Sequence, residues 1–448
     1  MMRMLSRFID IRPGEFFRVS VMAFLLFFLI AANNLIKILR DSIFLGHHAV
    51  SELPYLYILI AVLAGTLIAI YTRYTANISI IRLIVATNAV ILSNIVFFWV
   101  LLTYFDPSWS HYAFYIWSAM ATAIAVAQAW TLVNHIFTLD QAGRAFGLIA
   151  AGGTVGGVVA SFGAQWSIHL SVESHHLLWV VAGVYIVASA LVLWAERRLD
   201  GKISEGETWR TEKSETPYSS KIGELLSGSA YLRTVAVIIL VSVIVSTLID
   251  FHFKISAKQA YPSTRELAVF FSSYYGWLNV ATFFAQLLLT GRTLSKLGLG
   301  PTLNLAPAVL LSGSVAIVIW PGLVASMLTR MADTILRNST HRSGMEMIYM
   351  AVPANVVKAV KTFLDVVVER VGDASAGFII LLFSLFTAEK YIAYVHFICV
   401  GLIFSWIVLI RFLRSGYAEA LRRGVLSVEP SLPSGSEATA HPKLSSGD

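Results

Sequence analysis

The strongest constraint on the fold is a series of continuous apolar stretches that runs through most of the chain. Each is about as long as the ~20 helical residues that cross the roughly 30 Å hydrocarbon core of a bilayer. Inside that core only helices and closed barrels satisfy their backbone groups, and barrel strands would alternate apolar and polar residues. These stretches do not alternate, and only 13% of the 448 residues are charged. The sequence therefore predicts an all-α integral membrane protein.

The apolar stretches fall into two groups of six, giving about twelve spans in all. We expect the first six at 17–40, 54–72, 80–102, 112–137, 146–168 and 176–195, and the last six at 230–253, 268–290, 301–320, 322–342, 364–387 and 391–413. The predicted organisation is an N-terminal half at 1–195, a cytoplasmic linker at 196–229, a C-terminal half at 230–414 and a disordered tail at 415–448.

The two halves share weak sequence similarity. The first and seventh spans end NNLIKILRD (33–41) and STLIDFHFK (246–254), each apolar and then charged after a polar pair. Spans five and eleven share an arginine and two glycines in the same order. Such repeats suggest two six-helix halves related by an axis along the membrane normal, the major facilitator architecture.

Basic residues predict the orientation in the membrane. Lys and Arg gather in the terminal segments, the central linker and the loops on one side, as at Arg12, Arg144 and Arg197. The positive-inside rule therefore places both termini in the cytoplasm, and we expect a monomeric protein of a bacterial inner membrane. The net charge of +7 needs no nucleic-acid partner. Cys399 is the only cysteine, and no motif predicts a metal or a cofactor.

The segment LTRMADTILRNSTHR (328–342) places charge inside a predicted span. Arg330, Asp333, Arg337 and His341 are spaced by three or four residues and share one helix face. That face cannot point at lipid, where each charge costs at least ~2.5–3.5 kcal/mol. One alternative is an internal charge network that locks helices together. The other is a cavity for an anion, which the excess of arginine over aspartate favours.

The first span has a second charged face. Lys37 and Arg40 are three residues apart, Asp41 follows, and Asn34 lies one turn deeper. The charges could snorkel to the membrane interface, or the polar face could extend into a cavity. Lys37, Arg40, Arg330 and Arg337 would then attract an anion, and Asp41, Asp250 and Asp333 would hold these cations in the empty site.

Two more spans carry polar groups. Asp250 and Lys254 in the seventh span are i,i+4 partners, either a local pair at the membrane rim or part of a substrate site. Asn134 in the fourth span could bind substrate or join helices. The segment KAVKTFLDVVVER (358–370) could be a solvated face, or an inner gate in which Asp365, Glu369 or Arg370 bridges to Arg144.

Four segments carry a family resemblance that covers most of residues 12–413. They are KILRDSIF (37–44), LIDFHFKISAKQAYP (248–262), LNLAPAVLL (303–311) and the run from MEMIYMAVP to KAVKTFLDVVVERVGDASAG (345–377). On these the chain resembles a divergent member of the ATP/ADP translocases of plastids and intracellular bacteria, which are distantly related to the major facilitator superfamily.

The resemblance implies a transporter that moves an anionic, phosphorylated solute by alternating access and exchange. It points to Lys37, Arg40, Asp250 in the place of a glutamate, Lys254, Glu346, Asp365 and Arg370. No motif predicts an enzyme. Two other functions remain open on the residues alone. One is a proton-coupled exporter of amphipathic molecules, and the other is a membrane scaffold or sensor that transports nothing.

Overall fold

The computed structural model describes residues 15–75, 78–137, 139–198, 227–288, 299–349, 357, 360–361, 363–386 and 395–426. These residues are almost entirely helical and contain no strand. The first group comprises α2 (Phe16–His47), α3 (Leu53–Thr75), α4 (Ile80–Val100), α5 (Ser108–Ile136), α6 (Leu139–His169) and α7 (Leu177–Arg198). The second comprises α10 (Ala230–Ala260), α11 (Thr264–Leu288), α13 (Leu299–Ile319), α14 (Leu323–Leu336), α15 (Arg342–Tyr349), α17 (Glu369–Phe386) and α18 (Val395–Leu426). Short 3₁₀ turns cover Val50–Glu52 and Ser174–His176, and π-helical segments cover Leu101–Phe105, Arg337–His341 and Phe363–Val368.

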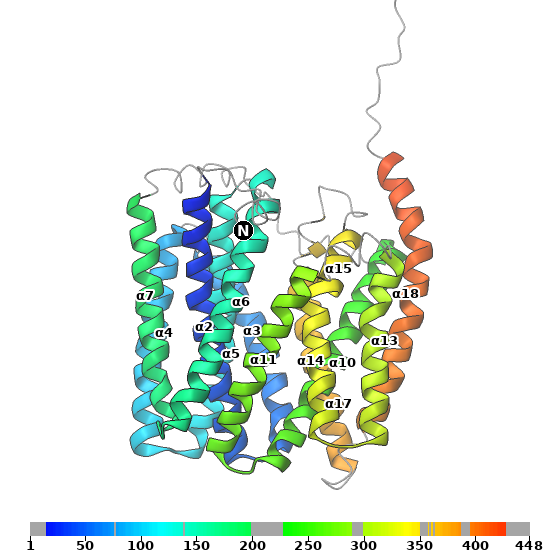
Figure 1. Ribbon diagram of the computed structural model, residues 1–448. Helices are drawn as coiled ribbons and strands as arrows, with labels where there is room; N and C mark the ends of the chain where they lie inside the picture. The colour runs from blue at the N-terminus through cyan, green and yellow to red at the C-terminus, as the bar shows by residue number, and fades with distance from the viewer. Residues whose placement is uncertain are drawn as a thin grey trace, which may run out of the picture.

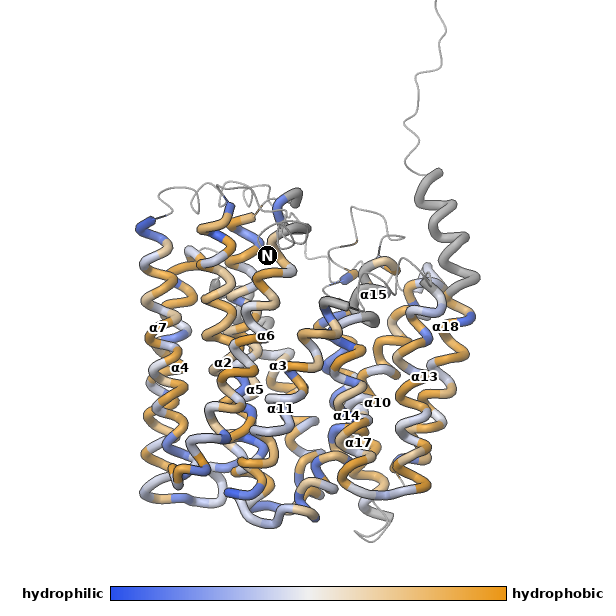
Figure 2. Tube along the Cα trace, in the orientation of Figure 1, coloured by the Kyte–Doolittle hydropathy of each residue, from blue (hydrophilic) through white to orange (hydrophobic). Residues whose placement is uncertain are grey.

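The outside of the bundle is apolar, as a lipid-facing surface requires. Nine helices in the described part of the chain are long and apolar enough to cross a membrane. Large apolar side chains stand exposed around them, Trp320 at 80% among them, and Figure 2 shows hydrophobic residues along most helices. The helices that fall outside these nine include α11, α14 and α17, which carry polar and charged side chains into the interior. The predicted all-α membrane fold is confirmed.

The two groups of helices stand side by side (Figure 1). Between them, α11 packs against α6 and α2, and α17 packs against α3. The described N-terminal end of the chain and the far end of α18 lie at the same end of the bundle. The connection from α10 to α11 lies at the opposite end.

The expected ends of two spans were wrong. The first span was placed at 17–40 and the seventh at 230–253, but α2 continues to His47 and α10 to Ala260. A hydropathy-based boundary falls where charges begin, whereas these helices continue because their charges are paired within the bundle. Lys37 and Arg40 therefore lie about 10–15 Å inside the end of α2 at 1.5 Å per residue. Arg40 binds the fully buried Asp41 there, so its charge is met inside the bundle.

The tenth span is not one regular helix over 322–342. After Leu336 the chain forms a π-helical segment, Arg337–His341, and then continues as α15 to Tyr349. A π turn contains an additional residue, so side chains beyond Arg337 rotate relative to the α14 face. The i+4 relation predicted between Arg337 and His341 therefore does not hold as it would in an α-helix.

The glycine-rich segment GGTVGG (152–157) lets α6 approach its neighbours closely. A Cβ at Gly156 would overlap the carbonyl oxygen of Phe27 on α2, and one at Gly157 would lie 2.9 Å from the Asn279 side chain on α11. Small residues are the usual means of close helix packing in membranes. Glycine here brings α6 against both a helix of its own group and one of the other.

We expect Gly156→Ala to destabilise the protein by about 1–3 kcal/mol, since backbone must move to relieve the overlap. The matched control is Gly147→Ala on the same helix, where a Cβ would meet nothing within 4 Å. Thermal unfolding of the two variants in detergent measures the difference. Equal melting temperatures would show that close α2–α6 packing does not require this glycine.

Candidate functional site

A cavity of about 310 Å³ lies between the two groups of helices. Its lining comes from both groups and comprises Arg40, Tyr57, Ile60, Tyr115, Ala119, Val243, Ser246, Thr247, Asp250, Lys254, Arg330, Arg337, Glu369, Arg370 and Asp373. Five of these side chains are cationic and three are carboxylates. Charges in the middle of a membrane protein are held by pairing or by water, and here most are paired.

The pairs form a continuous series that begins on α2. Asp41, which is fully buried, binds Arg40 at 2.9 Å between guanidinium nitrogen and carboxylate oxygen. The same carboxylate lies 3.6 Å from the ammonium nitrogen of Lys254 on α10. Lys254 in turn pairs with Asp250 at 2.9 Å, one turn away on its own helix. This series links the two groups of helices through charge.

The series continues onto α14 through Arg330. Its guanidinium binds Asp250 at 3.0 Å and Asp333 at 2.6 Å. The Ser246 hydroxyl donates to Asp333 at 2.6 Å and lies 3.0 Å from Arg330. Asp333 is buried, and the spacing of Arg330 and Asp333 places both toward the interior, as the lipid argument required.

Arg337 is the most weakly held cation of the series. It lies 3.8 Å from Asp333 and donates to the Ser242 carbonyl at 3.0 Å, while its Nε has no hydrogen-bond partner. Its side chain is 32% exposed. A guanidinium that is partly unpaired and open to a cavity is well suited to bind an anionic group that enters it.

Three tyrosines complete the site, and the sequence analysis did not identify them. Tyr275 donates to Asp41 at 2.8 Å, Tyr57 donates to Asp250 at 3.3 Å, and Lys254 donates to the Tyr115 hydroxyl at 3.0 Å. Lys37 lies over the Tyr275 ring at 4.3 Å, and Arg40 over the Tyr115 ring at 4.6 Å. The tyrosine rings thus contact cations through their faces, and the tyrosine hydroxyls form hydrogen bonds with charged groups.

The two groups of helices are hydrogen-bonded to each other at the end where α10 turns into α11. There Lys258 donates to the Gly46 carbonyl at 3.3 Å, and Arg265 donates to the Ile168 carbonyl at 3.0 Å. Both contacts join the second group of helices to the first. The Asp41–Lys254 pair lies between these contacts and the cavity.

The sequence model of a family described as TLC ATP/ADP transporter matches residues 97–336, more than half of the chain. The chain belongs to this family. Two of the four resembling segments, 248–262 and 303–311, lie inside the match. The family is one of transporters, not of enzymes.

Relatives and solved structures agree with this membership. ADP,ATP carrier protein 2 of Chlamydia pneumoniae is 23% identical over 384 residues, which cover 73% of this chain and 70% of the carrier. The chloroplastic ADP,ATP carrier protein 1 of Arabidopsis thaliana is 23% identical over 256 residues, covering 54% of this chain and 40% of the carrier. The match thus spans less than half of this plant relative.

The fold is that of major facilitator transporters. The nucleoside transporter NupG superposes with a TM-score of 0.63 at 12% identity, covering 89% of this chain and 99% of NupG. FucP, a Major Facilitator Superfamily transporter in its outward conformation, superposes with a TM-score of 0.54 at 15% identity, covering 88% and 98%. The predicted major-facilitator-like architecture is confirmed.

Three other predicted site residues lie outside the cavity lining. Asn34 accepts a hydrogen bond from Asn279 at 3.1 Å, so it joins α2 to α11. Asn134 is exposed near the end of α5. Asp365 accepts from the Tyr349 hydroxyl at 2.8 Å. Arg370 does line the cavity, where it pairs with Asp373 at 2.9 Å.

The predicted inner gate stays a prediction. Glu369 and Arg370 line the cavity, but the side chain of Arg144, their expected partner, lies outside the described ones, as do those of His341 and Glu346. The backbones of Arg144, His341 and Glu346 belong to α6, the π-helical segment and α15.

The serines and Asp373 were also missed, although the sequence held a signal for the serines. Ser242, Ser246, Asp250 and Lys254 recur every four residues on α10, which puts them on one face. Asp373 follows Arg370 by three residues and accepts from Thr247 at 3.0 Å. Each central carboxylate is engaged by a cation, so the cavity suits an anion better than a metal.

Proposed function

We propose that the chain is a secondary active transporter that moves an anionic, phosphorylated, nucleotide-like solute by alternating access and exchange. The observation that carries the proposal is the cavity between the two groups of helices, with Arg40, Lys254, Arg330, Arg337 and Arg370 in its lining. Membership of an ATP/ADP transporter family and the similarity to ADP,ATP carrier proteins support the same class of solute.

Arginine is the side chain best matched to phosphate, because its planar guanidinium donates two parallel hydrogen bonds. Arg337 has an unpaired Nε, and Arg370 is about one-third exposed. Both could bind a phosphate without first breaking an ion pair to another helix, because Arg337 pairs with Asp333 and Arg370 with Asp373 in their own segments. Arg40 and Arg330, held by Asp41 and by Asp250 and Asp333, supply positive potential deeper in the cavity.

The ion pairs also suggest how binding is coupled to conformational change. Asp41 and Lys254 occupy the same position in the aligned segments NNLIKILRD and STLIDFHFK, as do Lys37 and Asp250 with opposite charges. The Asp41–Lys254 pair joins the two groups. An anion that attracts Lys254 and Arg330 weakens their hold on Asp41 and Asp250, which lowers the cost of separating the groups at this end.

The same network accounts for exchange. Without an anion, the cations stay bound to their carboxylates and hold one conformation. The empty carrier then returns slowly, and a second anion speeds the return. A proton-coupled exporter would instead need a carboxylate free to titrate, whereas Asp41, Asp250 and Asp333 are each paired.

The orientation and organisation are part of the proposal. We place both termini in the cytoplasm of a bacterial inner-membrane protein, with halves at 1–195 and 230–414 around a cytoplasmic linker and a monomer as the working unit. The disordered tail expected at 415–448 is wrong at its start, because α18 continues to Leu426. The basic residues of the sequence support this orientation. The cavity then opens toward the cytoplasm, because the contacts of Lys258 and Arg265 that join the two groups lie at the opposite end.

A ligand screen tests the proposed solute class. The detergent-purified protein is heated with ATP, ADP, other nucleotides, sugar phosphates, inorganic phosphate, amino acids or lipophilic cations. A ligand present at about 100 times its dissociation constant adds ~2.7 kcal/mol to the stability if it binds only the folded state. We expect nucleotides or related phosphates to raise the melting temperature. Stabilisation by lipophilic cations alone would contradict the proposal and favour an exporter of amphipathic molecules.

A further inference from the structure

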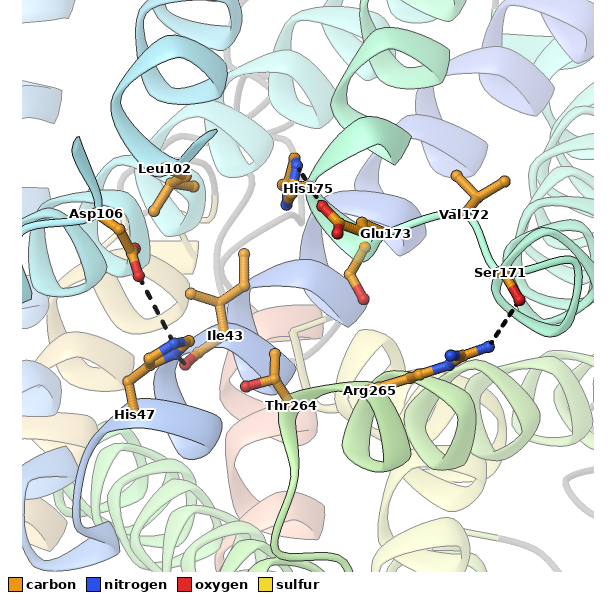
Figure 3. Close-up of a pocket in the computed structure, with 11 residues that line it drawn as sticks. Ile43, His47, Leu102, Asp106, Ser171, Val172, Glu173, His175, Thr264 and Arg265 are labelled. Carbon is orange, nitrogen blue, oxygen red and sulfur yellow. Dashed lines mark hydrogen bonds and ion pairs between the residues drawn. The ribbon is translucent and has the colours of Figure 1, made fainter. Parts of the chain in front are cut away.

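Three metal-ligating side chains meet at the end of the bundle where α10 turns into α11. His47 ends α2, Asp106 lies between a π-helical segment and α5, and His111 is in the first turn of α5. The Nε2 of His111 lies 2.8 Å from one Asp106 carboxylate oxygen, and the Nε2 of His47 lies 3.9 Å from the other. The three ligand atoms all lie within 4.8 Å of one another. Figure 3 shows His47 and Asp106 facing each other at the edge of a pocket.

The other ring nitrogen of each histidine also has a hydrogen-bond partner. The Nδ1 of His47 lies 2.9 Å from the Ile43 carbonyl, which can only accept, so the lone pair of Nε2 in neutral His47 faces Asp106. The Nδ1 of His111 lies 3.0 Å from Nε2 of His48. The Nε2 of His111 lies at hydrogen-bond distance from Asp106, where either a proton or a metal ion can join the two atoms.

The lone pair of His47 that faces the Asp106 carboxylate favours a cation between them. A metal ion at this point would replace the proton that otherwise joins Nε2 of His111 to Asp106 at 2.8 Å. A metal ligand that donates its second N–H to an acceptor is the usual arrangement of protein-bound imidazole. The Ile43 carbonyl is that acceptor for His47, and Nε2 of His48 is placed to be the acceptor for His111.

The backbone at Asp106 is also unusual. Its φ is 39°, in the left-handed region, and among the described residues Ser171 is the only other non-glycine residue with positive φ. A π-helical segment, Leu101–Phe105, leads directly into it, and the Asp106 N–H closes that segment on the Leu101 carbonyl at 2.8 Å. Such strain and π turns cluster at functional sites. The strained turn directs the carboxylate at the two imidazoles.

We propose that His47, Asp106 and His111 bind one divalent transition-metal ion, with Zn²⁺ the best fit. Two imidazoles and one carboxylate form a three-ligand zinc set, and water fills the fourth position. Ligand atoms around tetrahedral zinc stand about 3.4 Å apart. His47 is 39% exposed and free to rotate inward to that separation. The sequence analysis expected no metal because the ligands come from separate segments without a motif.

The ion would tie the end of α2 to the start of α5. The neighbouring Gly46 carbonyl accepts from Lys258 of the second group. The metal thus fixes the part of α2 against which the second group closes, on the helix that carries Arg40 and Asp41. Such a site is separate from the anion cavity and independent of which solute is transported.

The test is a Zn²⁺ titration of the purified full chain, stripped with EDTA and free of affinity tags, in competition with a chromogenic chelator. We expect one equivalent to bind. Loss of a residue that hydrogen-bonds a metal ligand lowers metal affinity by about 10–100-fold, and we expect that reduction for His48→Ala. His47→Ala and His111→Ala each remove a ligand itself and should lower the Zn²⁺ affinity further. The matched control is His169→Ala, an exposed histidine at the same end of the bundle.

Folding and location are checked separately. His47 is at an exposed position, so His47→Ala keeps the proposal testable if the buried His111 variant fails to fold. Co²⁺ in place of Zn²⁺ should give the visible absorption of a four-coordinate site in wild type and not in His47→Ala. Unchanged Zn²⁺ binding in both His47→Ala and His111→Ala, or an equal loss of Zn²⁺ binding in His169→Ala, would overturn the proposed site. So would loss on His176→Ala alone, which would place the ion at Glu173, His175 and His176 instead.

Discussion

Replacing Lys254 with methionine is expected to destabilise the protein by about 3–5 kcal/mol, the cost of removing one partner from a buried ion pair. Lys254 is 2% exposed and lies between Asp41 and Asp250. Methionine keeps the volume but leaves two carboxylates with one cation fewer. Thermal and denaturant unfolding in detergent would measure the loss, and transport should fail in parallel.

The matched control for this change is Lys258→Met, one turn along α10. Among the described residues Lys258 binds the Gly46 and Pro262 carbonyls and no carboxylate, so its replacement leaves no buried charge without a partner. A Lys254→Met protein as stable as Lys258→Met would mean that the series of ion pairs does not hold the two groups of helices together.

Arg337→Ala is expected to reduce transport and solute binding by about 10–100-fold while the protein stays folded. The reduction corresponds to losing one charge-assisted hydrogen bond to the solute, worth ~1.5–3 kcal/mol. Stability is retained because Asp333 keeps Arg330 and Ser246 as close partners. The measurements are solute affinity by thermal shift and initial uptake rates in proteoliposomes.

Two further variants sharpen the Arg337 result. Arg337→Lys keeps the positive charge but loses the planar guanidinium, so its uptake rate should lie between those of the wild type and Arg337→Ala. The control variant is Arg233→Ala, which removes an exposed arginine at the start of α10. Arg233 donates to the Ser227 carbonyl and does not line the cavity. Wild-type uptake by Arg337→Ala would remove this residue from the site.

The sequence predicted the all-α membrane fold and the inward direction of the charges because exposing a charge or an unpaired backbone group to lipid is costly. Apolar runs of spanning length indicate helices, and charges within them must face inward, as Arg330 and Asp333 do. These inferences need only the cost of exposing a charge or a backbone group to lipid.

The pairing within the site could not be predicted from the sequence. Which carboxylate holds which cation depends on how α2, α10 and α14 face one another, and no spacing within one helix contains that information. Tyr57, Tyr115 and Tyr275 were missed because a tyrosine in an apolar helix suits a lipid interface equally well. The π-helical segment after Leu336 changed the face on which His341 was expected. The cluster of His47, Asp106 and His111 depends on a strained turn that residue types alone do not reveal.

Counter-exchange in proteoliposomes tests the central claim most directly. Vesicles that contain the purified protein are loaded with unlabelled ADP or with buffer, and uptake of labelled ATP is followed for wild type, Arg337→Ala and Arg233→Ala. We predict rapid uptake only into ADP-loaded vesicles, retained in Arg233→Ala and reduced at least about tenfold in Arg337→Ala. Uptake that ignores the internal nucleotide and the loss of Arg337 would contradict an exchange carrier whose anion binds in this cavity.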